Sequence, residues 1–230
     1  MSQKKPRKKG KGLMKFAICY YTSNRENPEF EKKIQDNILS ITDLPIISVS
    51  QKPIDFGKNI CVGDVGVSGF NCFRQIQIAL KNTDADFVIS AEADCLYPPD
   101  YFKKDTFAIN KCFRMNNLYV MGDHRSYYWR KLEGATHAQV IYRKFYLDRL
   151  NKLFEGAPEW STEEFNFPKE RHKQADVFDE SEIRRYFLPY PVVQIKTHNG
   201  MRYHTHSERI NIYDIPYWGN GKKLRKRICG

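Results

Sequence analysis

The sequence lacks several features that would each point to a familiar class of protein. No hydrophobic run approaches the roughly 20 residues that a membrane-spanning helix needs, so we expect no transmembrane segment. Lys15 interrupts the apolar stretch behind the basic N-terminus, so we expect no secretory signal. The patterns GxxxxGK[ST], GxGxxG and GxSxG are also absent, which argues against phosphate-loop ATPases, dinucleotide-binding dehydrogenases and nucleophile-elbow hydrolases.

Paired cysteines are lacking as well. The six cysteines (Cys19, Cys61, Cys72, Cys95, Cys112 and Cys229) include no Cys-x-x-Cys pair, the spacing typical of zinc sites and redox motifs. We therefore expect reduced thiols in a cytoplasmic compartment, with neither disulfides nor a zinc site.

The composition is that of a globular protein with an uneven charge. Of 230 residues, 41% are hydrophobic and 14% aromatic, enough to bury a core. Residues 2–12 carry six Lys/Arg and residues 219–230 carry five, without any acid, so these two segments account for the whole net charge of +11. Blocks of like charge act as arms that grip polyanions, so we expect contact with nucleic acid or an anionic membrane surface. A role in solubility alone is the alternative.

Strand-like and helix-like segments alternate through about residue 155. The hydrophobic periodicity predicts strands at 15–22, 45–50, 86–91, 118–121 and 136–142, and helices at 28–41, 70–80, 98–112 and 143–153. This order predicts an α/β fold with a mixed, mostly parallel sheet flanked by helices. A glycine-rich crossing loop is expected at 52–69. Residues 189–196 and 201–206 flank Asn199-Gly200 and predict a C-terminal β-hairpin.

Two carboxylates follow the buried strand that ends at Ala91. Glu92 and Asp94 are separated by one residue, so on an extended chain both point to the same side. At the carboxyl edge of a parallel sheet, two acids with no cation nearby in the sequence favour a bound divalent ion, and oxygen ligands suit Mg²⁺ or Mn²⁺. His204 and His206 share a face of the predicted hairpin and are candidates for a third ligand. A turn or helix cap is the alternative for the acids, and an ordinary surface strand for the histidines.

The acid-x-acid motif lies downstream of Gly66-x-Ser68-x-x-Asn71-x-x-Arg74, and the combination resembles the GT-A glycosyltransferases. Within that family it is similar to the family-2-like branch, including phage enzymes that glycosylate hydroxymethylated DNA bases. The resemblance covers about residues 15–150 and implies a GT-A-like, Rossmann-like fold. It also implies a nucleotide-sugar donor, with UDP-glucose expected, and Mn²⁺ or Mg²⁺ as cofactor. The family usually has Asp-x-Asp, whereas Glu92 stands first here.

The resemblance implies roles for individual residues. Glu92 and Asp94 would hold the metal on the donor's diphosphate, completed by His204 or His206. The expected donor-binding positions are Tyr21, Thr22, Asn24, Arg25, Gly66, Ser68, Asn71, Arg74 and Glu92. Arg74 and the metal would neutralise the leaving group.

If the transfer inverts configuration, a carboxylate must accept the acceptor's proton. Glu163 or Glu164, in an acidic stretch, is the expected base, and Asp123 is a further catalytic candidate near the sugar or the acceptor. A solvated acidic loop and a simple turn are the respective alternatives. A retaining enzyme would need no such base, and the sequence does not decide between the two outcomes.

These expectations divide the chain into one catalytic domain with two tails. Residues 1–14 are expected to be a basic flexible tail and 219–230 a basic C-terminal tail. The domain spans 15–218, with a nucleotide-sugar half at 15–112 and an acceptor half at 113–218.

The basic tails favour DNA carrying 5-hydroxymethylated pyrimidines as the acceptor, and the host cytoplasm as the location if a phage encodes the protein. The alternatives are a glycosyltransferase acting on a cell-envelope polysaccharide or lipid-linked sugar, a nucleotidyltransferase, and a non-catalytic nucleic-acid-binding module.

Overall fold

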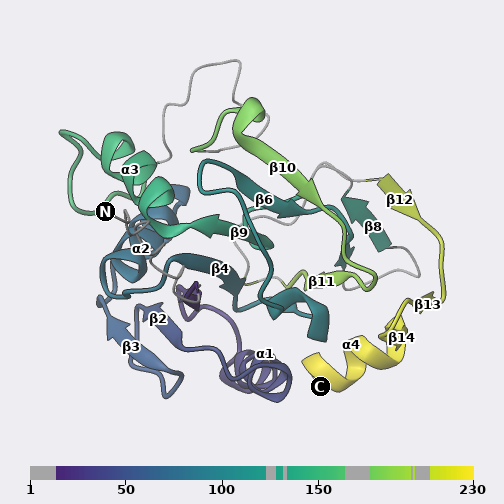
Figure 1. Ribbon diagram of the computed structural model, residues 1–230. Coiled ribbons are helices and arrows are strands. Elements are labelled where there is room, and N and C mark those ends of the chain that lie inside the picture. Colours follow the sequence, from purple (N-terminus) through teal and green to yellow (C-terminus); the bar gives the residue numbers. More distant parts are fainter. Residues whose placement is uncertain (1–13, 123–127, 132–133, 164–176, 198, 200–207) are drawn as a thin grey trace, which may run out of the picture.

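A computed structural model describes residues 14–122, 128–131, 134–163, 177–197, 199 and 208–230 (Figure 1). Its centre is a seven-stranded sheet in the order β10-β6-β9-β4-β1-β2-β3. The strands are β1 (Phe16–Thr22), β2 (Ile46–Ser50), β3 (Lys58–Cys61), β4 (Phe87–Glu92), β6 (Cys112–Met115), β9 (Gln139–Tyr142) and β10 (Ile183–Tyr186). The run from β4 to β3 is parallel, β9 is antiparallel to both neighbours, and β10 is parallel to β6.

A second sheet stands beside the first in the order β12-β8-β7-β11-β5. Its strands are β5 (Cys95–Leu96), β7 (Leu118–Met121), β8 (Tyr128–Lys131), β11 (Val192–Ile195) and β12 (Glu208–Ile210). A two-stranded hairpin of β13 (Asp214–Ile215) and β14 (Gly219–Asn220) follows it. Because β5 begins three residues after the end of β4, the acid-x-acid segment is the link between the two sheets.

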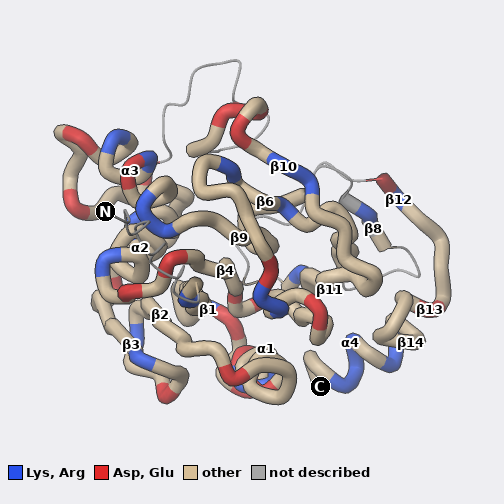
Figure 2. The backbone as a smooth tube through the Cα atoms, in the orientation of Figure 1, with Lys and Arg blue, Asp and Glu red and all other residues tan. Residues whose placement is uncertain are grey.

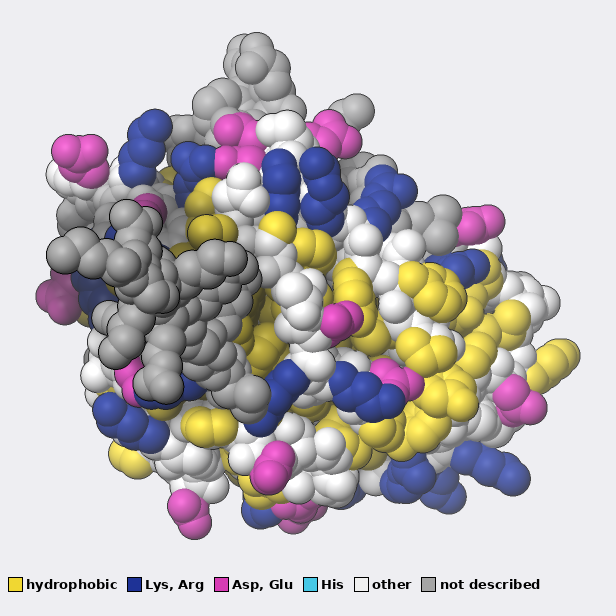
Figure 3. Space-filling view, in the orientation of Figure 1, with side chains coloured by type: hydrophobic (Ala, Val, Ile, Leu, Met, Phe, Trp, Pro, Cys, Tyr) yellow, Lys and Arg dark blue, Asp and Glu magenta, His cyan; other side chains and the backbone are white. Residues whose placement is uncertain are grey.

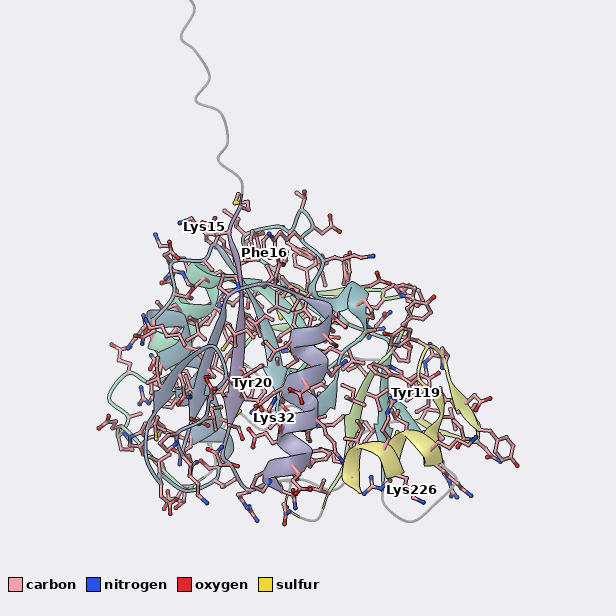
Figure 4. The ribbon with its side chains drawn as sticks, turned by 90° about the horizontal axis from the view of Figure 1, so that it is seen from below. Lys15, Phe16, Tyr20, Lys32, Tyr119 and Lys226 are labelled. Carbon is pink, nitrogen blue, oxygen red and sulfur yellow. The ribbon has the colours of Figure 1, made fainter. Side chains whose placement is uncertain are left out.

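Helices cover both faces of the central sheet. The helices are α1 (Pro28–Ile41), α2 (Gly69–Lys81), α3 (Arg143–Leu153) and α4 (Gly221–Cys229), with single 3₁₀ turns η1 (Pro99–Phe102) and η3 (Glu180–Glu182). One core cluster joins α1 to alternate residues of β1, and a second joins α2 and α3 to the residues between them. Tyr20 reaches the α1 side, where its hydroxyl donates to Glu31 at 2.8 Å (Figure 4). Every residue of β1 is buried, as expected for a strand covered on both faces.

Local signals explain where the two helices nearest the sheet edge begin. The Asn27 side chain accepts hydrogen bonds from the first turn of α1, and Pro28 occupies the first helical position. Ser68 caps α2 by accepting from the Asn71 backbone N–H at 3.0 Å. Both helices therefore start just beyond the carboxyl ends of parallel strands, which places their first turns at the same edge as Glu92.

The predicted fold class, a mixed and mostly parallel sheet flanked by helices, is confirmed. The helix expected at 98–112 is wrong, because the two prolines open only the single turn η1 and Cys112 begins strand β6. The expected hairpin partner at 201–206 lies outside the described residues, and β11 pairs with β7 and β5 instead. Among the described residues, the consecutive strands β13 and β14 form an antiparallel hairpin nearer the C-terminus. No helix among the described residues is long and apolar enough to cross a membrane.

The basic C-terminal tail predicted at 219–230 contains the helix α4, and this helix packs on the core. Leu224 and Ile228, four residues apart, are 2% and 7% exposed and join the core cluster that contains α1. Lys33 of α1 donates from Nζ to the carbonyls of Arg227 at 3.0 Å and Ile228 at 3.2 Å, so a cation stabilises the last turn. The charged side chains are left on the outer face of α4, where Figure 4 shows Lys226 pointing away from the body.

Candidate functional site

A cavity of about 150 Å³ opens at the carboxyl ends of β1 and β4, beside the first two turns of α2. Eight of the residues that the sequence singled out line it: Tyr21, Thr22, Arg25, Gly66, Ser68, Asn71, Glu92 and Asp94. These residues come from three separate stretches of the chain. The fold therefore brings most of the predicted donor and metal residues to one place, which is where ligands bind in open α/β sheets.

Glu92 faces the cavity from the last position of β4. Its Oε1 accepts a hydrogen bond from the Tyr21 hydroxyl at 2.7 Å, and its backbone N–H donates to the Tyr97 hydroxyl at 2.9 Å. Burial and the Glu92 carboxylate raise the pKa of Tyr21 well above its ordinary value, so this hydroxyl stays protonated and remains a donor. These two tyrosines hold Glu92 at the edge of the sheet.

Asp94 has a positively charged neighbour that the sequence did not reveal. Its Oδ2 accepts from Gln194 Nε2 at 3.0 Å and lies 3.9 Å from Nζ of Lys196, a residue that is only 6% exposed. Lys196 directly follows β11, about a hundred residues further along the chain. No Lys or Arg lies near Asp94 in the sequence, but the fold supplies one, so charge repulsion alone does not require a metal.

The donor set of the cavity nevertheless fits a divalent ion. Glu92 and Asp94 both line it, and a third carboxylate, Glu26, lines it from the loop before α1. Carboxylate oxygens are the ligands that Mg²⁺ and Mn²⁺ prefer. Three carboxylates line one cavity, so a cation bound among them would reduce their mutual repulsion.

Glu26 is a cavity residue that sequence reasoning missed. The Thr197 hydroxyl lies 2.7 Å from each of its carboxylate oxygens. Burial raises the pKa of Glu26, the Thr197 hydrogen bond lowers it, and the nearby Asp94 charge raises it, with a net upward shift. The sequence offered one signal for Glu26, a carboxylate shortly after the first strand. Its contact with Thr197 could not be predicted, because the two residues are 171 positions apart.

Replacing Glu26 by Gln is expected to raise the melting temperature at about pH 7, where the buried charge costs stability. The pKa of Glu26 is higher in the folded protein than in the unfolded chain. The stability associated with protonated Glu26 is therefore fully present below the unfolded pKa. It is lost as the pH rises through the folded pKa. Below about pH 4 the gain should vanish. Calorimetry at both pH values measures this, with exposed Glu155→Gln as the control. An equal gain at both pH values would contradict the assignment.

The glycine-rich loop and the N-terminus of α2 form another wall of the cavity. The Gly66 carbonyl accepts from Gln51 Nε2 at 2.7 Å, and Asn71 Nδ2 donates to the same carbonyl at 3.2 Å. Gly66 has a φ of +78°, and a Cβ there would lie 2.7 Å from the Thr162 methyl group, so only glycine fits. Ser68 Oγ donates to the Ser161 carbonyl at 2.6 Å. Segment 161–163 is thereby tied over the loop.

Two of the predicted donor residues do not line the cavity. Asn24, at φ 54°, accepts at Oδ1 from the backbone N–H groups of Gln51 at 2.9 Å and Lys52 at 2.8 Å. It therefore fixes the turn after β1 to the end of β2. Arg74 donates to the carbonyls of Glu159 and Pro158 and is not among the residues that line the cavity, so the geometry gives no support to a contact of Asn24 or Arg74 with the nucleotide.

Arg74 holds a neighbouring loop in place. Its Nε donates to the Glu159 carbonyl at 2.8 Å and its Nη2 to the Pro158 carbonyl at 2.7 Å. Its guanidinium carbon lies 3.7 Å from the centre of the Phe154 ring. These contacts belong to the segment that follows α3 and make Arg74 a packing residue.

Replacing Arg74 by Met is expected to lower the free energy of unfolding by about 1–2 kcal/mol, because three hydrogen bonds, to Glu159, Pro158 and Gln77, and a cation–π contact are lost. The affinity for a nucleotide-sugar donor should change less than threefold, since Arg74 does not reach the cavity. Urea denaturation and a binding titration on the same variant measure both quantities. Unchanged stability with a tenfold loss of affinity would place Arg74 at the donor after all.

The predicted catalytic carboxylates and histidines are only partly described. Glu163 is exposed, and its backbone N–H donates to Ser161 Oγ at 3.1 Å. Its neighbour Thr162 lies next to Gly66 of the cavity loop, so Glu163 is close to the cavity in the sequence but is not among the residues that line it. Glu164, Asp123, His204 and His206 lie outside the described residues. Their proposed roles stay predictions.

Comparisons with known proteins find similarity at the level of structure only. No protein-family model matches the chain, and no curated protein does. One similar solved structure is Staphylococcus aureus TarS 1–349 in complex with UDP-GlcNAc, with 12% identity over 94% of this chain and 65% of that one, at a TM-score of 0.45. Another is the catalytic domain of Drosophila β1,4-galactosyltransferase 7 with xylobiose, with 9% identity over 95% and 80%, also at 0.45.

A third similar structure is the bifunctional IspDF of Campylobacter jejuni, with 10% identity over 84% of this chain and a TM-score of 0.42. The chain spans only 52% of that protein and 30% of a second TarS structure. These likenesses are too distant to assign an activity. The side chains of the cavity therefore have to carry the functional interpretation.

Proposed function

We propose that the protein is a metal-dependent glycosyltransferase that moves a hexose from a nucleotide sugar to a hydroxyl acceptor. UDP-glucose is the expected donor, and a 5-hydroxymethylated pyrimidine in DNA is the preferred acceptor. The observation that carries this proposal is the cavity in which Glu92 and Asp94 meet Tyr21, Thr22 and the start of α2. It combines ligands for a cation with a site for phosphate.

Two features of the cavity would stabilise the negative charge of the leaving diphosphate. A divalent cation held by Glu92 and Asp94 would supply positive charge to the diphosphate as it leaves. The N-terminus of α2 carries a partial positive charge, and its N-cap Ser68 and Asn71 of its first turn line the same cavity as the acids, so it would bind the same phosphates. Tyr21 and Thr22, at the end of β1, would contact the nucleoside.

An inverting transfer also needs a carboxylate that accepts the acceptor's proton. Glu163 stays the predicted base, and Glu26 is a second candidate because it lies in the cavity with a raised pKa. Comparing turnover of Glu163→Gln and Glu26→Gln at equal donor saturation distinguishes them. The base variant should lose about 10²-fold or more in turnover, while the other keeps most of it. If neither loses turnover, a retaining reaction without a base is supported.

The acceptor proposal rests on helix α4. Its exposed Lys222, Lys223, Lys226 and Arg227 project from one face of the molecule, visible in Figure 2 as the basic stretch along α4. Arg225 of the same helix donates from both terminal nitrogens to the Lys196 carbonyl at 3.2 Å, and Lys196 neighbours Asp94. A polyanion bound to α4 would therefore lie close to the donor cavity, and DNA phosphates suit such a surface.

One observation favours a second acceptor class. Tyr190, Tyr213 and Tyr217 are 41%, 73% and 51% exposed, and Tyr190 and Tyr217 have ring centres 5.1 Å apart. Figure 3 shows a hydrophobic patch over the β13–β14 side of the molecule with Lys and Arg below it. Exposed aromatic rings beside basic residues are typical of a surface that meets an anionic membrane. A lipid-linked or cell-envelope sugar acceptor is therefore the alternative.

A screen of nucleoside-diphosphate sugars with and without Mn²⁺ tests the activity. We expect one donor to stabilise the protein against heat only when metal is present, and to be consumed when hydroxymethylated DNA is added. Consumption of a nucleoside triphosphate with release of pyrophosphate would instead support a nucleotidyltransferase. DNA binding without effect of any donor, unchanged in Glu92→Ala, would indicate a non-catalytic binding module.

A further inference from the structure

Behind Glu92 the structure brings together three different metal-ligating groups. One donor atom each from Glu92, Cys95 and His137 lies within 4.8 Å of the other two. Cys95 is fully buried at the start of β5, and His137 is 4% exposed just before β9. The sequence predicted a reduced thiol here and no zinc site, because the residues of this cluster are brought together by the fold and have no metal-ligand spacing in the sequence.

The backbone around the cluster is fixed by a buried tyrosine. The Tyr97 hydroxyl accepts from the Glu92 backbone N–H at 2.9 Å and donates to the His137 carbonyl at 2.9 Å. Tyr97 is itself fully buried and stacks on Tyr101 with ring centres 4.6 Å apart. One hydrogen-bonded side chain thus holds the ends of β4 and the segment before β9 together, which provides the rigid support that a metal site requires.

The chemistry of these donors selects among divalent ions. A thiolate and an imidazole are ligands for Zn²⁺ and Co²⁺, whereas Mg²⁺ takes oxygen ligands almost exclusively. Three protein ligands of mixed N, O and S type are the number found in zinc sites that keep one exchangeable position. Asp94 provides a further oxygen beside the cluster, because Cys95 Sγ donates to its Oδ1 at 3.1 Å.

We propose that Glu92, Cys95 and His137 bind one thiophilic divalent ion of the Zn²⁺ or Co²⁺ type, and that this ion is the one Glu92 presents to the cavity. Binding forms a metal–sulfur bond and breaks the S–H bond of Cys95, whose proton leaves to solvent, so no electron transfer is involved. This inference deepens the proposed function by naming the ion, but ion binding itself requires neither sugar nor nucleotide.

Titration of the metal-free full chain with Co²⁺, without nucleotide, tests the proposal. We expect a near-ultraviolet sulfur-to-cobalt absorption band that saturates at one ion per chain, and that Zn²⁺ removes but excess Mg²⁺ does not. The band should be lost in Cys95→Ser and its midpoint should shift at least tenfold in His137→Gln. Cys72→Ser is the matched control, because Cys72 lines the cavity but is not in the cluster, and it should leave the band unchanged.

The absence of the band in the wild-type chain would overturn the proposal whether or not the variants fold, and so would a band that persists in Cys95→Ser. Circular dichroism of each variant checks folding. A donor that binds with Mn²⁺ or Mg²⁺ while no cobalt–sulfur band forms would refute this inference and leave the glycosyltransferase intact. A cobalt–sulfur band with no binding of any nucleotide sugar would confirm the ion and refute the glycosyltransferase.

Discussion

Asp94→Asn is expected to weaken metal-dependent binding of the nucleotide-sugar donor at least a hundredfold. The substitution keeps the size of the side chain and an oxygen for Gln194 Nε2 but removes the negative charge that faces the cavity. A single charge pair at 4 Å is worth about 4 kcal/mol at an effective dielectric constant of 20, which corresponds to a factor of about 10³. Calorimetric titration of UDP-glucose into protein saturated with Mn²⁺ measures the loss.

Lys196 complicates this experiment and also supplies its control. Asp94→Asn leaves the buried Lys196 ammonium without its carboxylate, so the variant should also melt at a lower temperature. The double variant Asp94→Asn, Lys196→Met should regain stability without regaining metal-dependent binding. Asp55→Asn, on the exposed loop before β3, should alter neither quantity. Full donor affinity in Asp94→Asn would rule out Asp94 as a metal-site residue.

Neutralising the outer face of α4 is expected to lower affinity for duplex DNA at least a hundredfold. Changing Lys222, Lys223, Lys226 and Arg227 to Gln removes four exposed positive charges, while Leu224 and Ile228 keep the helix packed. If all four charges contact phosphate, the slope of log K against log salt concentration should fall by about 3.6, since each contact contributes about 0.9. Fluorescence anisotropy at several salt concentrations measures both effects.

The matched control replaces four exposed lysines elsewhere in the molecule by Gln and so removes the same amount of positive charge. These are Lys52, Lys81, Lys104 and Lys144. Equal losses in the two variants would mean that net charge, rather than α4, attracts the DNA. Co-sedimentation with vesicles of anionic lipid, run on the same proteins, separates the two acceptor classes. Loss of vesicle binding with unchanged DNA binding would favour the lipid-linked acceptor.

The sequence predicted those parts of the fold that have long, regular hydrophobic patterns. The first strand is buried throughout, and α1 and α2 have the expected apolar face, so their existence followed from composition and spacing. Strands β6, β8 and β10 have four residues each, and an Arg interrupts the apolar run in every one of them, whereas the equally short β7 is apolar throughout. The C-terminal helix was hidden by its charge, because only Leu224 and Ile228 mark its buried face.

The candidate site divides in the same way. Tyr21, Glu92 and Asp94 could be predicted because each stands at the end of a recognisable strand, and strand ends meet at one edge of a parallel sheet. The contact of Lys196 with Asp94 could not be predicted, because the two residues are about a hundred positions apart and meet through the second sheet. His137 could not be predicted beside Cys95 either, because about forty positions separate them and the segment before β9 brings them together. Contacts of this kind carry no local signal in a single sequence.

The most direct test is a pair of crystal structures of the protein with UDP-glucose, one with Mn²⁺ and one with Co²⁺, in which anomalous scattering locates the metal. The account predicts that the metal that supports donor binding gives one peak within coordination distance of a Glu92 carboxylate oxygen, with the donor's diphosphate between that ion and the N-terminus of α2. A diphosphate bound away from Glu92 and Asp94, or a cavity that holds the donor with no metal beside these acids, would contradict it.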